Sequence, residues 1–284
     1  MNRLVRGFLV VGILLTLVSC ATVPLTGRRQ LDLISSKTMI RMSWQQYRDF
    51  LNKHKLSSDR EKVEMVQRVG KRIQQAVERY MRDHGMADRL KDYQWEFNLV
   101  ESDEVNAWSM PGGKVVVYTG ILPVTRDETG LAIVLGHEIA HVVARHGNER
   151  MSQALLAGRG EAAMSTAMKK KPQETRRLWM TVFGVGAQYG ILLPYSRLHE
   201  QEADRLGLIF TAMAGYDPRE AVAFWKRMAA HKKGRFVPEF LSSHPSNQRR
   251  IQYIKSVLPE ALRYYHPSED TKNRPAEVGT ERKE

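Results

Sequence analysis

The chain has 284 residues, of which 42% are hydrophobic and 26% are charged. This length predicts one or two domains, and the composition is that of an ordinary globular protein, which excludes a disordered chain, a collagen-like chain and a coiled-coil rod. The 44 Lys and Arg residues outnumber the 31 Asp and Glu residues, so the formal net charge is +13. We find no internal repeat of fixed period, which argues against solenoids and propellers.

The first nineteen residues have the pattern of a secretory signal. A basic start at Arg3 and Arg6 precedes an apolar run at 8–18, which is shorter than the ~20 residues of a membrane-spanning helix. The residues at 17–20 also resemble a bacterial lipobox, which implies that Cys20, the only cysteine, carries a lipid anchor. Ala21 then implies the outer membrane, if the host is Gram-negative. The alternative is a plain signal peptide with an incidental cysteine.

The rest of the chain is expected to form one domain at 37–266, between a tether at 20–36 and a disordered tail at 267–284. Apolar periodicity and capping residues predict helices, in chain order at 36–53, 58–84, 127–146, 196–214, 219–230 and 247–258. Alternating apolar residues predict extended segments at 95–100, 104–109 and 115–118. Residues 152–177 are expected to be a mobile lobe or lid, and the apolar stretch 178–193 a buried or lid helix.

The chemistry is concentrated in His137-Glu138-Ile139-Ala140-His141. Residues four apart on a helix are separated by about 40°, so both imidazoles point to the same side and can bind one metal ion. Glu138 lies about 100° away from His137 around the helix, beside the metal, where a base for metal-bound water belongs.

A catalytic zinc needs a third protein ligand and an open position for water. The segment 196–204 offers Glu200, and Asp204 on the same helical face can accept the free N–H of a ligand histidine. His199 is the rival third ligand. Glu202 is expected to face solvent or a salt bridge, and His146, about 140° from His141, is not expected to be a ligand.

The HExxH motif at 137–141 and the SRxxExEAD motif at 196–204 together resemble the M48 family of zinc metallopeptidases, in particular its periplasmic lipoproteins without transmembrane helices. The resemblance covers about residues 25–260 and includes the TGRRQL start, PGGKVVVYTG and a late His-Pro followed by an arginine. It implies an α+β fold of the gluzincin type, which is mainly helical, holds one Zn²⁺ per chain and has a small β-sheet beside the active-site helix.

The resemblance also implies substrate-binding residues. In gluzincins an edge strand that carries Asn-Ala binds an extended substrate, and Asn106 and Ala107 would be that pair here. Main-chain pairing suits a protease of broad specificity, because it does not depend on the substrate's side chains. The alternative is that Asn106 only forms a turn before Pro111.

These motifs predict a hydrolase: a zinc metalloendopeptidase whose Glu138 serves as the base. Family and lipobox together imply a lipoprotein at the periplasmic face of the outer membrane, with envelope proteins as substrates and a task in quality control of outer-membrane proteins. The alternative is a chaperone-like partner of outer-membrane assembly machinery with a latent zinc site. The scattered basic residues do not favour a nucleic-acid partner.

The late His-Pro contains a further candidate for the site, His244. Pro245 favours an extended conformation for His244, and Arg250 follows at the start of a predicted helix. With three ligands assigned, His244 could be a fourth ligand that makes the site latent, a catalytic donor to the oxyanion, or a residue that only pins its loop.

Overall fold

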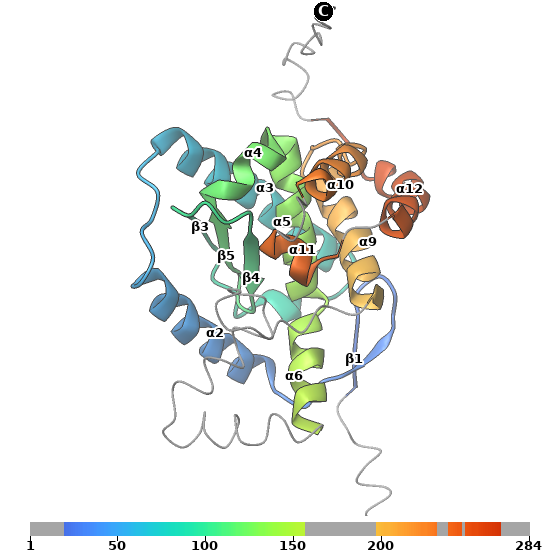
Figure 1. Cartoon of the computed structure of the whole chain (residues 1–284). Helices are drawn as coiled ribbons and strands as arrows, with labels where there is room; N and C mark the ends of the chain where they lie inside the picture. Colours follow the sequence, from blue (N-terminus) through green and yellow to red (C-terminus); the bar gives the residue numbers. More distant parts are fainter. Residues whose placement is uncertain (1–19, 157–196, 232–237, 246–247, 268–284) are drawn as a thin grey trace, which may run out of the picture.

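The computed structural model describes residues 20–156, 197–231, 238–245 and 248–267. These residues form five short strands and a larger number of helices, which gives the expected α+β, mainly helical fold (Figure 1). The strands are β1 (Cys20–Thr22), β2 (Arg29–Leu31), β3 (Glu96–Val100), β4 (Ala107–Met110) and β5 (Lys114–Tyr118). The helices are α2 (Ser36–Leu51), α3 (Arg60–Asp83), α4 (Leu122–Thr125), α5 (Glu128–Val143), α6 (His146–Leu156), α9 (Arg197–Met213), α10 (Glu220–Ala230), α11 (Glu239–Ser243) and α12 (Gln248–Leu262), with 3-10 turns at Ala87–Leu90 and Thr119–Ile121.

The three-stranded sheet has the order β3-β5-β4, with β5 parallel to β3 and antiparallel to β4. Its side chains alternate between two apolar clusters, as the period of a strand requires. Val115 and Val117 face the cluster formed with α3, α5 and α9, whereas Val116 and Tyr118 face the one formed with α2. The sheet is therefore covered on both faces, and β4 is left as an edge strand beside α5 (Figure 1).

Residues 20–36, for which the sequence predicts a tether, are largely structured. Strands β1 and β2 form an antiparallel hairpin in which Cys20 pairs with Leu31. Val23, in the turn region, is 1% exposed and belongs to the main core. The hairpin is held by side chains that a sequence pattern does not reveal, above all by Arg28, whose guanidinium lies between Glu149 of α6 and Glu202 of α9.

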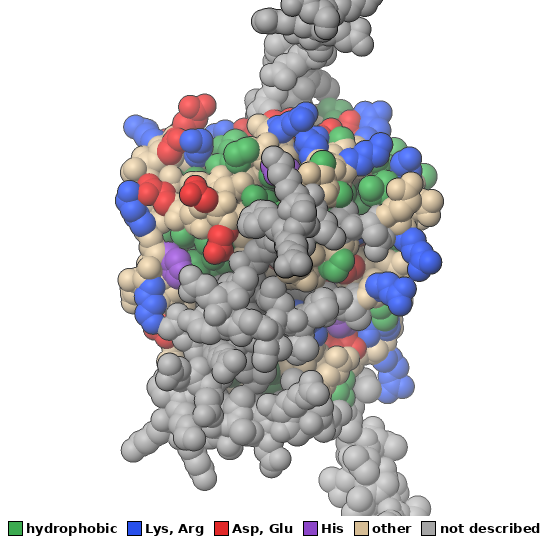
Figure 2. Space-filling view, viewed as in Figure 1, with side chains coloured by type: hydrophobic (Ala, Val, Ile, Leu, Met, Phe, Trp, Pro, Cys, Tyr) green, Lys and Arg blue, Asp and Glu red, His purple; other side chains and the backbone are tan. Residues whose placement is uncertain are grey.

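Several predicted segments fall outside the described residues. They are the signal segment 1–19, the part of the predicted lobe at 157–177, the apolar stretch 178–193, and the tail from residue 268. The first residues of the predicted lobe, 152–156, belong to helix α6. No helix in the described part of the chain is long and apolar enough to span a membrane. On the face seen in Figure 2, Lys and Arg side chains lie at several separate places, with Asp and Glu side chains among them.

Candidate metal centre

Helix α5 carries the two histidines of the HExxH motif. The side chain of Asp127 caps its first turn by accepting from the main-chain N of Gly130, at 2.8 Å. The helix ends at Val143, not at residue 146 as the sequence pattern predicts, because Arg145 adopts a left-handed conformation with φ of 61°. His146 therefore begins a new helix, α6, and its Nδ1 lies 2.9 Å from Nδ1 of His141.

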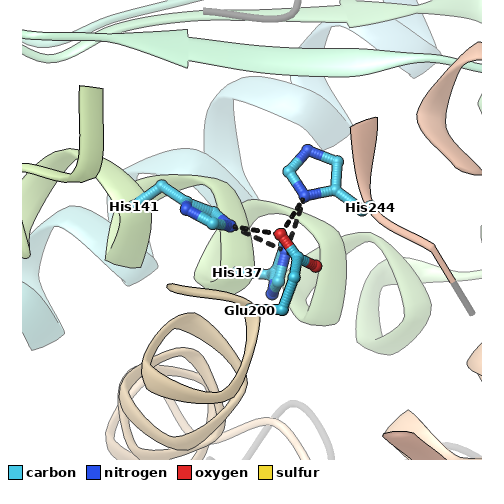
Figure 3. A group of neighbouring side chains, drawn as sticks. All are labelled: His137, His141, Glu200 and His244. Atoms are coloured by element: carbon cyan, nitrogen blue, oxygen red, sulfur yellow. Dashed lines mark hydrogen bonds and ion pairs between the residues drawn. The ribbon is translucent and has the colours of Figure 1, made fainter. Parts of the chain in front are cut away.

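Four buried side chains converge beside α5 (Figure 3): His137 and His141 from α5, Glu200 from α9, and His244 from the end of α11. Nε2 of His137 lies 3.1 Å from Nε2 of His141 and 3.2 Å from Nδ1 of His244. Oε1 of Glu200 lies 2.9 Å from Nδ1 of His244 and 3.3 Å from Nε2 of His141. One ligand atom from each residue thus lies within 4.8 Å of all the others.

These spacings fit a tetrahedral zinc site. With metal–ligand bonds of about 2.0–2.1 Å, neighbouring ligand atoms of a tetrahedron are about 3.3 Å apart. Four of the pairs are separated by 2.9–3.3 Å, and Nε2 of His137 lies 3.6 Å from Oε2 of Glu200, so these separations are close to that value. Three imidazoles and one carboxylate are also a donor set that zinc accepts. The geometry is therefore that of a site able to hold one metal ion.

Residues 197–204 contribute four buried polar side chains, and each has different neighbours. Glu200 points into the four-residue group, whereas His199, the rival ligand, directs Nε2 to Glu149 at 2.9 Å. Glu202, for which solvent exposure or a salt bridge was expected, is 3% exposed and pairs with Arg28 and with Nε2 of His146. Its burial was not predicted, because an angular position on one helix does not reveal what packs against it.

Asp204 and Arg250 surround the ligands. Oδ1 of Asp204 lies 3.1 Å from Nδ1 of His137, the atom that points away from the other candidate ligands. Arg250 bonds both carboxylate oxygens of Asp204, at 2.7 and 2.9 Å, and its other terminal nitrogen lies 2.8 Å from Oε2 of Glu200. The guanidinium also stacks 3.5 Å from the ring of Trp225. Arg250 thereby holds the carboxylates of Asp204 and Glu200 in a fixed orientation.

The electrostatics of the group favour charged carboxylates. Burial acts against the charged form of Glu200, but nearby His244 and Arg250 hold its pKa well below the usual range. For His137, burial and Arg250 oppose protonation, yet Asp204 and Glu200 raise its pKa to about 9. In the absence of metal, this histidine therefore binds a proton that an incoming cation must displace.

Glu138 is buried beside the group and is not one of its four members. Burial raises the pKa of its carboxyl, so the side chain is a stronger base than an exposed glutamate. Its Oε1 lies 3.2 Å from Nε2 of His244. The main-chain carbonyl of Glu138 accepts from Oγ of Ser109 at 2.7 Å, which ties α5 to strand β4.

Asn106 and Ala107 lie where the edge strand begins. Both are buried, and Tyr118 of β5 donates its main-chain N–H to the carbonyl of Asn106 at 3.1 Å. Asn106 is 1% exposed, and neither polar atom of its side-chain amide has a hydrogen-bond partner among the described residues. A buried amide without partners is costly, so it is a candidate contact for a ligand.

Comparison with known proteins gives a consistent family. The model of peptidase family M48 matches residues 67–258. The mitochondrial metalloendopeptidase OMA1 of Schizosaccharomyces pombe is 35% identical over 84% of the chain, and its human counterpart is 30% identical over the same share. The beta-barrel assembly-enhancing protease of Escherichia coli is 28% identical over 55% of the chain. The chain spans 66%, 46% and 33% of the lengths of these three relatives.

These relatives correct the expectation of a bacterial envelope protein. The proteins matched over 84% of the chain are named as mitochondrial, whereas the bacterial beta-barrel assembly-enhancing protease matches a smaller part at lower identity. The outer-membrane location and the task in outer-membrane quality control are therefore not supported. Lipidation of Cys20 stays a prediction, because the signal segment before it lies outside the described residues.

Proposed function

Because the chain belongs to peptidase family M48, we propose that it is a zinc-dependent endopeptidase that binds one Zn²⁺ through His137, His141 and Glu200. The observation that carries this proposal is the convergence of buried ligand atoms with Glu138 beside them. Two imidazoles and a carboxylate, with a fourth position for water or substrate, form the ligand set of a catalytic zinc.

When bound there, zinc supplies a Lewis acid and a water of lowered pKa. Side chains of the protein transfer the protons and orient the metal ligands. Glu138 takes a proton from the attacking water and returns it to the leaving amine. Asp204 accepts the Nδ1–H of His137 and so directs the Nε2 lone pair toward the ligand group. Arg250 holds Asp204 and Glu200 in place.

The substrate binds as an additional strand along β4. This strand is at the edge of the sheet, and it is tied to α5 through Ser109. An extended peptide beside it obtains main-chain hydrogen bonds from the edge, together with the amide of Asn106. The substrates are therefore proteins or peptides in extended conformation, recognised mainly through their main chain.

His244 lies in the ligand group, and α11 contacts the chain just before β4. Nδ1 of His244 is the fourth atom of the ligand group, and the main-chain N–H of Phe240 in α11 bonds the carbonyl of Val105 just before β4 at 3.2 Å. A fourth protein ligand leaves zinc without an open position. This supports a latent resting state, in which His244 leaves before a peptide bond is hydrolysed.

The test combines metal analysis with proteolysis of casein. Wild type, Glu138→Gln and the exposed-site control Glu61→Gln are compared, each also in a His244→Ala background. Glu138→Gln should bind zinc like wild type and lose activity by about 10²–10⁴-fold, the range for removal of a general base, whereas Glu61→Gln should retain it. A zinc-loaded protein that cleaves nothing in either background, or full activity of Glu138→Gln, would overturn the proposal.

A further inference from the structure

A second buried group of polar side chains lies behind His141. Nδ1 of His141 is 2.9 Å from Nδ1 of His146, and Nε2 of His146 is 3.0 Å from Oε2 of Glu202. Glu202 in turn accepts from Nε of Arg28 at 2.9 Å and from the hydroxyl of Thr26 at 2.9 Å. A continuous line of contacts therefore runs from the N-terminal hairpin to a member of the metal-binding group.

Hydrogen-bond chemistry gives this line a direction. The Glu202 carboxylate only accepts, so His146 donates to it through Nε2–H. A neutral His146 then has its lone pair on Nδ1 and accepts the Nδ1–H of His141. This places the remaining lone pair of His141 on Nε2, the atom that lies 3.1 Å from Nε2 of His137. If Nδ1 of His146 donated instead, Nδ1 of His141 would have to accept, and the proton of His141 would then lie on Nε2, where it blocks metal binding.

We propose that His146 is a positioning residue that fixes the metal-binding tautomer and ring orientation of His141, and that Glu202 and Arg28 hold His146 in this role. The inference rests on the proposed function, because it takes His141 as a zinc ligand. In this proposal the two ligand histidines have different hydrogen-bond partners. The carboxylate of Asp204 orients His137, whereas the imidazole of His146, which is bonded to Glu202, orients His141. It also makes the N-terminal hairpin a part of the metal centre.

The test measures zinc affinity directly, by competition with a chelating dye, and the visible spectrum of the cobalt-loaded protein. His146→Leu and His146→Asn have side chains of similar size, but only Asn offers an acceptor near the position of Nδ1. His146→Leu should weaken zinc binding by about 10–100-fold, the range for outer partners of metal ligands, and change the cobalt spectrum. His146→Asn should recover most of the affinity. If the ring served packing alone, Leu would be the better replacement and the order would reverse.

His199→Leu is the matched control. The His199 ring is also buried and stacks on that of His146 with centroids 4.4 Å apart, but its Nε2 bonds Glu149 and not a proposed ligand. Its replacement should leave zinc affinity unchanged. Folding of all variants is compared by circular dichroism in chelator, so that loss of metal binding is separated from loss of structure.

Arg28→Gln tests the same line of contacts without changing a core residue, because the Arg28 side chain is 22% exposed. It should weaken zinc binding less than His146→Leu, and should add nothing when combined with it, since both act through one line of contacts. Additive effects, or equal zinc affinity of His146→Leu and wild type, would overturn the inference. Tight zinc binding without peptidase activity would instead refute the proposed function alone.

Discussion

Gly136 on α5 and Gly207 on α9 meet where the two helices cross. A Cβ atom added to Gly207 would lie 2.8 Å from the main-chain N of His137, and one added to Gly136 would lie 2.7 Å from the main-chain O of Gly207. Only hydrogen fits at either position. The close crossing brings the face of α9 that carries Glu200 against the face of α5 that carries His137 and His141, so the helix contact sets the distances within the metal centre.

Gly207→Ala should therefore damage both fold and site. The added methyl group meets backbone and not the flexible end of a side chain, so the helices must separate, at a cost of about 1–3 kcal/mol in the free energy of unfolding. We expect weaker zinc binding as well, because Glu200 moves with α9. Urea unfolding and dye competition measure the two effects. Gln201→Ala, at an exposed position of the same helix, is the control, and a Gly207→Ala protein with the stability of that control would contradict the role of the crossing.

The positions of the candidate ligands follow largely from residue spacing within single helices. The contacts between helices that support these ligands do not follow from such spacing. The i, i+4 spacing of His137 and His141 places both rings on one side of α5, and the same spacing joins Glu200 to Asp204. The crossing at Gly136 and Gly207 depends on two segments far apart in sequence, so neither glycine stands out in the chain.

The surroundings of Glu202 show the same limit. A helical wheel gives its angle relative to Glu200, but its neighbours come from the N-terminal hairpin and from α6, which begins only because Arg145 turns left-handed. The sequence gives no sign of that break, because arginine is not a residue type that commonly adopts the left-handed conformation. The sequence therefore predicts which side chains share one face of a helix. It does not predict which other elements pack against that face and bury it.

Removal of the Glu200 carboxylate charge should abolish tight zinc binding. Glu200→Gln keeps the shape of the side chain and lacks the charge that Arg250 and the histidines surround. We expect zinc affinity to fall by more than the ~100-fold typical for loss of an outer partner, measured by dye competition. Gln201→Ala serves again as the control on α9. Unchanged affinity would mean that another carboxylate completes the site.

Acid should loosen the contact between the hairpin and α6. Burial opposes the charged form of Glu149, but its bonds to His199 and Arg28 lower its pKa to about 2, from an ordinary value near 4.5. A carboxyl with a lowered pKa stabilises the fold above its ordinary pKa, and this contribution is lost as the pH falls from about 4.5 toward about 2.

This loss of stability is measured by urea unfolding of the metal-free protein from about pH 6 down to about pH 3, which covers the upper part of that titration. Glu149→Gln does not titrate, so it should be less stable than wild type near neutrality and should lose less stability on acidification. Glu61→Gln, on the exposed first turn of α3, should follow the wild-type curve. Parallel curves for wild type and Glu149→Gln would show that this carboxylate makes no pH-dependent contribution.

His244→Ala separates three roles of the late histidine. Nδ1 of His244 lies among the candidate ligand atoms while Nε2 lies 3.2 Å from Glu138, so in this arrangement one ring occupies the open metal position and covers the base. Its removal should open that position and release Glu138. We therefore expect higher peptidase activity per zinc-loaded molecule, together with a modest loss of zinc affinity, because three of four ligands remain.

The measurement is the rate of casein cleavage by wild type and His244→Ala at equal zinc content, with Ser242→Ala in the same helix α11 as the control for loop disturbance. A histidine that donates to the oxyanion would give the opposite sign, a fall of about 10²-fold or more. A histidine that only pins its loop would leave the zinc-loaded rate unchanged. The sign of the change therefore decides the role, and only an increase, absent in Ser242→Ala, is compatible with a fourth ligand that keeps the site latent.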